Sequence, residues 1–172
     1  MKKVLVLLVF GLSMGGCSVT VPGLLTVNYP GVTTPAGGSG AATSAAGSGK
    51  RYEVVNQSLS WTDAKREAER RGGYLSVITS AEEQRLIESM VTRDGSKRGY
   101  WLGGYCENDR VFRWITGESM NYTNWGTGEP NNAGKNQDKM CFVHQPYNRV
   151  IFGQWDDDRY NISDYGYIIE WN

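Results

Sequence analysis

The chain has 172 residues, a length that suits one domain of ordinary size with additional segments. Its 18 basic and 18 acidic residues balance overall, but residues 1–50 contain three lysines and no acid, so residues 51–172 carry a net charge of −3. This distribution argues against a nucleic-acid-binding protein, because such proteins need a basic face.

Residues 1–17 have the pattern of an export signal. Two lysines precede an apolar run that continues to Met14, which is shorter than the roughly 20 residues that span a bilayer. Gly15 and Gly16 stand directly before Cys17, and the segment resembles a bacterial lipoprotein signal, whose cysteine is lipidated. The alternative is ordinary secretion with an incidental Cys17. We expect a lipid-anchored bacterial membrane protein, and Ser18 in place of Asp indicates by this resemblance the outer membrane or cell surface.

Residues 18–50 are expected to form a tether. The first half contains three prolines and no charge, and residues 36–49 are Gly, Ser, Ala and Thr only. Such a composition cannot bury enough apolar surface to fold and behaves as a flexible coil. We therefore expect no secondary structure there and a folded domain over residues 51–172.

The folded part is expected to combine two helices with short strands. Ser60 with Asp63, and Ser80 with Glu83, form capping patterns that predict two helix starts; glycines at positions 72, 73 and 95 predict the helix ends. The apolar patterns predict strands at residues 51–55, 100–105, 111–115, 140–144, 150–155 and 165–171, and an extended link at 74–78. Residues 116–139 form a long polar loop without periodicity, and a loop of this length is usually functional or disordered.

Two polar segments carry the candidate chemistry. Glu129 and Asn131 place a carboxylate and an amide oxygen two residues apart, and Pro130 between them can hold both on one side. Asp156 and Asp157 add two carboxylates. Because calcium binds six to eight oxygen ligands in flexible geometry, we interpret the two segments as the halves of one calcium site. The alternative is a common turn and a solvated strand end.

The folded part resembles C-type lectin-like domains, over about residues 51–172. The resemblance implies an α+β fold in which two helices flank two small antiparallel sheets and a long loop region carries the ligand. The matching motifs are Ser60-Trp-Thr-Asp-Ala64, Gly72-Gly-Tyr-Leu75, Tyr100-Trp-Leu-Gly-Gly104, Phe112-Arg-Trp-Ile-Thr-Gly117, Asn121-Tyr-Thr-Asn-Trp125, Glu129-Pro130-Asn131, Trp155-Asp156-Asp157 and Tyr165-Gly-Tyr-Ile-Ile-Glu-Trp171.

The resemblance implies calcium-dependent carbohydrate binding. In this family Glu-Pro-Asn accompanies mannose-type sugars, which here means mannose, glucose, N-acetylglucosamine or fucose, and the peptide bond before the proline is cis. A fifth ligand is usual before the next strand; the family spacing reaches Gln137, and Asp138 is the nearer carboxylate. The expected metal ligands are Glu129, Asn131, Asp138, Asp156 and Asp157, and the expected sugar contacts are Glu129, Asn131 and Asp156.

The sequence departs from the family pattern at Asp156 and at the cysteines. Asp156 replaces the usual Asn, which keeps an oxygen ligand but removes an amide donor to the sugar. The usual disulfide partner of Cys141 is missing, and Cys106 is the only other candidate. We therefore predict a Cys106–Cys141 disulfide in an oxidising compartment, with two free buried thiols as the alternative. Ala68 and Ile169 occupy the positions of the other family disulfide, where we expect apolar packing instead.

We expect no enzymatic activity. Adjacent aspartates on a strand point to opposite faces and make a poor acid–base pair, and His144, the only histidine, lies in an apolar strand. The sequence thus predicts a calcium-dependent, carbohydrate-binding surface lipoprotein that serves adhesion or recognition, with avidity from several copies on one surface. The alternative is an adhesin or envelope scaffold of the same fold that binds protein instead of sugar.

Overall fold

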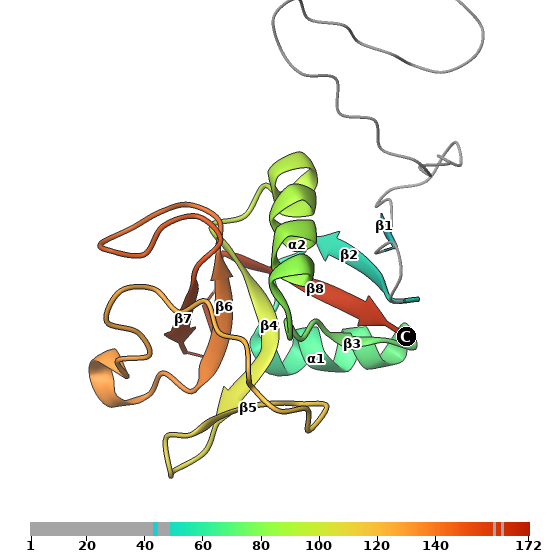
Figure 1. Ribbon diagram of the computed structural model, residues 1–172. Helices are drawn as coiled ribbons and strands as arrows, with labels where there is room; N and C mark the ends of the chain where they lie inside the picture. Colours follow the sequence, from blue (N-terminus) through green and yellow to red (C-terminus); the bar gives the residue numbers. More distant parts are fainter. Residues whose placement is uncertain (1–42, 45–48, 160, 163) are drawn as a thin grey trace, which may run out of the picture. The chain divides into compact units, whose positions relative to one another are not determined.

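The computed structural model describes residues 43–44, 49–159, 161–162 and 164–172 (Figure 1). The predicted signal segment, the lipidation site Cys17 and most of the predicted tether lie outside these residues. Within the described part, neither helix has the length and apolar character needed to cross a membrane.

Both helices begin where the capping patterns predict. The Ser60 side chain accepts a hydrogen bond from Asp63 N at the start of α1, and Ser80 does the same for Glu83 N at the start of α2. These bonds satisfy backbone donors that have no partner within the helix. The helices are α1 (Trp61–Arg70) and α2 (Ala81–Asp94). The strands are β1 (Thr43–Ser44), β2 (Arg51–Val55), β3 (Tyr74–Leu75), β4 (Gly99–Cys106), β5 (Phe112–Trp114), β6 (Lys139–Val143), β7 (Trp155–Asp158) and β8 (Tyr165–Trp171).

The strands form one hydrogen-bonded sheet in the order β1-β2-β8-β4-β6-β7, with β3 also pairing with β8 and β5 with β4. All neighbours are antiparallel except β4 and β8, which run parallel. This parallel pair joins the two small antiparallel sheets that we expected. Because Arg51 pairs with Trp171, the start of β2 lies beside the end of the chain. The loops around β6 and β7 gather away from the C-terminus (Figure 1).

Two apolar clusters form the core. One contains the inner face of α2 together with Trp114 and Trp155. The other contains the inner face of α1 together with Trp101. Ala68 and Ile169 are fully buried in this second cluster, which confirms that apolar packing occupies the positions of the missing disulfide.

Two local predictions are wrong. The strand predicted at 150–155 begins only at Trp155, because the preceding residues turn: Gln154 N donates to Ile151 O, and Gly153 has a φ of +86°. The predicted tether contains β1, whose residues Thr43 and Ser44 pair with β2. Pairing with an available edge strand thus places a short strand in a sequence of low strand propensity.

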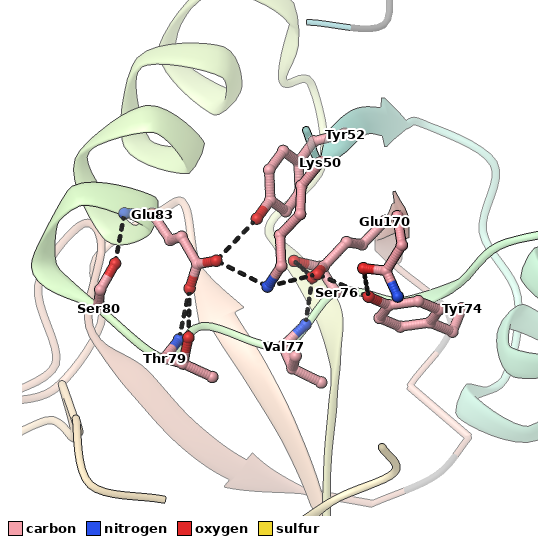
Figure 2. A network of polar contacts seen from close by, with 10 residues as sticks. Lys50, Tyr52, Tyr74, Ser76, Val77, Thr79, Ser80, Glu83 and Glu170 are labelled. Carbon is pink, nitrogen blue, oxygen red and sulfur yellow. Dashed lines mark hydrogen bonds and ion pairs between the residues drawn. The ribbon is translucent and has the colours of Figure 1, made fainter. Parts of the chain in front are cut away.

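The folded domain also includes Lys50, which the sequence assigned to the tether. Figure 2 shows its ammonium between two carboxylates, 2.8 Å from Glu83 Oε1 and 2.9 Å from Glu170 Oε1. The Glu170 side chain is fully buried and also accepts hydrogen bonds from Tyr74 Oη and Val77 N. This network links the residue before β2 to α2 and β8, so the domain starts at or before Lys50.

Candidate metal centre

The long loop between β5 and β6 contains no strand and only a three-residue 3-10 helix, Ala133–Lys135. Backbone hydrogen bonds attach its middle to β7: Trp155 N donates to Asn124 O, and Gly126 N donates to Trp155 O, each at 2.8 Å. A Cβ on Gly126 would lie 2.8 Å from the Val150 side chain, so glycine is needed for this close approach. The loop is therefore held beside the strand that carries Asp156 and Asp157.

Asp157 positions the Glu-Pro-Asn segment. Its side chain is fully buried, and its two carboxylate oxygens accept hydrogen bonds from the backbone N–H groups of Asn131 and Asn132, each at 2.8 Å. The Glu129–Pro130 peptide bond is cis, as the family resemblance implied. The two polar segments predicted from the sequence thus lie side by side.

Three carboxylates meet at this point. One oxygen from each of Glu129, Asp156 and Asp157 lies within 4.8 Å of the others, and this is the only such group of His, Cys, Asp or Glu in the described part of the chain. Glu129 Oε1 accepts a hydrogen bond from Asn131 Nδ2 at 2.8 Å, and Asp156 Oδ2 accepts one from Tyr147 Oη. Glu129 Oε2 is buried, and no N–H or O–H of the described residues donates to it.

The electrostatics of the cluster favour a proton or a cation. Burial, and next the negative charge of Asp156, raise the pKa of Glu129 to about 7. Burial also raises the pKa of Asp156. An all-oxygen donor set with a buried, unpartnered carboxylate oxygen fits a hard cation such as calcium, which prefers oxygen ligands.

Comparison with known proteins identifies the family of the chain. The family model described as "Lectin C-type domain" matches residues 57–165. The chain belongs to the C-type lectin domain family.

This C-type lectin domain protein is 32% identical over 158 residues to a perlucin-like protein of Mytilus galloprovincialis, a match that covers 87% of the chain and 97% of the relative. It is 28% identical to C-type lectin domain family 4 member G of Mus musculus over 71% of the chain, but spans only 39% of that longer protein. A similar solved structure is the cow CD23 carbohydrate-recognition domain in the presence of a GlcNAc2Man3 oligosaccharide, with 25% identity, a TM-score of 0.61 and coverage of 71% of this chain and 87% of that one.

The C-type lectin domain places two predicted metal ligands differently from the expectation. The Asn131 amide oxygen accepts a hydrogen bond from Ala133 N at 2.7 Å, so its amide nitrogen is the atom that contacts Glu129. Asp138 is not part of the carboxylate cluster; its Oδ2 pairs with Lys139 Nζ at 2.8 Å. Asp138 Oδ1 and Gln137 Oε1 are both buried without a donor in the described chain. The structure therefore does not bring the predicted fifth ligand to the others.

Three further side chains contact the site segments of the lectin domain, and sequence reasoning missed all of them. Arg110 Nη2 lies 3.3 Å from Asp157 Oδ2, and Tyr147 donates to Asp156. Gln84 Oε1 accepts a hydrogen bond from Trp155 Nε1 at 3.0 Å and thereby connects α2 to the start of β7. The contacts of Arg110 and Gln84 span 47 and 71 residues of chain, so no local pattern could have indicated them.

The predicted Cys106–Cys141 disulfide is wrong. Both cysteines are buried free thiols. Cys141 pairs with Trp101 across β4 and β6, whereas Cys106 N bonds to Asp138 O, three residues away from Cys141 along the chain. A separation of three residues along a strand corresponds to roughly 10 Å, and a disulfide requires Cα atoms within about 7 Å.

Proposed function

We propose that this C-type lectin domain binds carbohydrate through a calcium ion held by Glu129, Asp156 and Asp157. The observation that carries the proposal is the convergence of these three carboxylates, with Glu129 Oε2 buried and without a donor in the described chain. The proposed anchor is lipid on Cys17, which would display the domain on a bacterial surface for adhesion or recognition.

The residues of the site would divide the work of binding. Glu129, Asp156 and Asp157 would hold the ion, and a bound calcium with open coordination positions accepts two neighbouring sugar hydroxyls. Glu129 would also accept a hydrogen bond from one hydroxyl. Asn131, whose amide nitrogen already points into the site as a donor to Glu129 Oε1, would donate to the other.

The proposed sugar class is mannose-type, which includes glucose, N-acetylglucosamine and fucose. Support comes from the Glu129-Pro130-Asn131 sequence with its cis peptide bond, and from the similarity to a cow domain whose structure was obtained in the presence of a mannose-containing oligosaccharide. Asp156 provides no amide donor, and Tyr147 occupies its Oδ2. We therefore propose weak binding at a single site and useful avidity only from several anchored copies.

A second candidate function is protein binding by an adhesin or envelope scaffold. Two observations favour it: Asp156 lacks the amide donor, and Arg110 already pairs with Asp157, so the loop is held by protein groups alone. In this case calcium would not be needed for ligand binding.

The test is a glycan array followed by calorimetry with the full chain, in millimolar calcium and in chelator. Wild type and Glu118→Gln, an exposed acid of the same loop, are expected to bind mannose-type sugars in calcium only. Glu129→Gln is expected to lose both calcium and sugar. Sugar binding that persists in chelator contradicts the proposed role of calcium. No sugar binding at all contradicts the lectin function and favours the protein-binding candidate.

A further inference from the structure

Arg110 has an unusual backbone conformation at the end of the β4–β5 turn. Its N–H donates to Glu107 O at 3.0 Å, and its φ is +61°. This left-handed region is uncommon for residues that have a Cβ. The conformation therefore destabilises the folded state, and other contacts of Arg110 must offset this free energy.

The guanidinium of Arg110 joins three segments of the chain. Nη1 donates to Gln137 O at 2.8 Å, near the end of the long loop, and Nη2 donates to Asp157 Oδ2 at 3.3 Å on β7. A planar group with several fixed N–H donors can satisfy two such acceptors at once, which the single ammonium of lysine does less well. The side chain thus links the β4–β5 turn, the loop and β7.

Arg110 is also the resident positive charge of the carboxylate cluster. Among the described residues, it forms the only ion pair with Glu129, Asp156 or Asp157. The Asp157 side chain has no exposure, whereas that of Arg110 is 36% exposed. The charge therefore reaches a buried carboxylate from the surface. The same carboxylate accepts the N–H groups of Asn131 and Asn132, so Arg110 and two amides of the loop contact one side chain.

We propose that Arg110 is a positioning residue that supplies the positive charge of the site when no metal is bound: its guanidinium keeps residues 129–137 folded against β7. Calcium would then bind to a loop that is already ordered. The part of this inference that concerns calcium rests on the proposed function, whereas the part that concerns the loop does not.

The test is hydrogen exchange of the full chain in chelator and in saturating calcium. The reporters are the amides of Asn131 and Asn132, which donate to Asp157, and of Gln137, which donates to Asn132 Oδ1. The variants are Arg110→Gln, which removes the charge, and Arg110→Gly, which removes the charge and also relieves the positive φ. Arg113→Gln is the matched control, because Arg113 lies on the same hairpin and, within the described part of the chain, bonds only to Asp109 and Val111.

In chelator, both Arg110 variants are expected to exchange these amides roughly fivefold faster than wild type, the scale of one charge pair near a surface, while Arg113→Gln matches wild type. Amides of β8 report that the core remains folded. Saturating calcium is expected to restore protection in both variants. Unchanged exchange in chelator, or a fast Arg110→Gln with a wild-type-like Arg110→Gly, overturns the proposal. Fast exchange that calcium fails to restore supports the role of Arg110 and contradicts the proposed calcium site.

Discussion

The backbone N–H of Asn131 donates to Oδ1 of Asp157 at 2.8 Å, across 26 residues of chain. This bond and the neighbouring bond from Asn132 N to Oδ2 fix the position along β7 at which the loop contacts the strand. Asp157 is thereby a structural acceptor for the loop as well as a candidate ligand. The ligand-bearing segment is ordered by a group of the site itself.

Asp157→Asn is expected to destabilise the domain by about 1–3 kcal/mol, because an amide nitrogen replaces one carboxylate oxygen and leaves one of the two part-buried N–H groups, that of Asn131 or Asn132, without an acceptor. Denaturant unfolding in chelator measures the effect. The control is Asp164→Asn, whose side chain is 64% exposed and whose ion pair with Lys97 is long, at 3.9 Å; surface changes of this kind stay within about 0.5 kcal/mol. Equal stability of the two variants would contradict the role of Asp157 in the loop.

Calcium affinity is expected to fall as the pH drops from about 7 to 5. The pKa of Glu129 is raised to about 7 in the metal-free fold, so below that value the ion must displace a proton, which lowers the apparent affinity by at most about tenfold per pH unit for one proton. Calorimetric titration between pH 5 and 8 measures the slope. An affinity that does not change over this range is incompatible with Glu129 as a ligand.

The raised pKa of Glu129 affects the stability of the metal-free protein in the opposite direction to calcium affinity: it stabilises the fold at low pH. The folded-state pKa of Glu129 lies above its ordinary value of 4.5, so the folded state binds this proton more tightly than the unfolded state does. Its contribution to stability is present below about pH 4.5 and is lost as the pH rises to about 7. In chelator, the stability difference between wild type and Glu129→Gln should therefore vary with pH in this window.

Lys50→Met is expected to cost about 3 kcal/mol of unfolding free energy, because it leaves Glu83 and Glu170 buried without their shared cation. Lys65→Met is the matched control, since Lys65 forms an exposed pair with Glu69 and such pairs contribute at most about 1 kcal/mol. Thermal and denaturant unfolding of both variants measure the difference. A Lys50 variant as stable as the control would indicate that Lys50 belongs to the tether and not to the folded domain.

Reducing agent is expected to leave the melting temperature unchanged, because Cys106 and Cys141 are free thiols in different environments. Mass spectrometry of the unreduced, alkylated protein should find both cysteines modified after unfolding. A melting temperature that falls by several degrees on reduction would restore the disulfide prediction and require a different register of β4 and β6.

The amino-acid sequence by itself determined the features that depend on neighbouring residues. Ser60 and Ser80 begin helices because a serine side-chain oxygen can accept the N–H three residues later within the first helical turn. The Glu129-Pro130-Asn131 and Asp156-Asp157 segments were likewise recognisable, because several oxygen atoms stand within a few residues in each.

Tertiary structure alone decided which distant groups meet. The register of β6 against β4 separates the two thiols, and the path of the loop leaves Asp138 with Lys139 instead of the carboxylates. The β4–β5 turn places Arg110 beside Asp157, and the fold places Lys50 between two buried acids. These contacts depend on strand register and loop direction, which arise from packing over the whole domain, so no periodicity or spacing along the chain encodes them visibly.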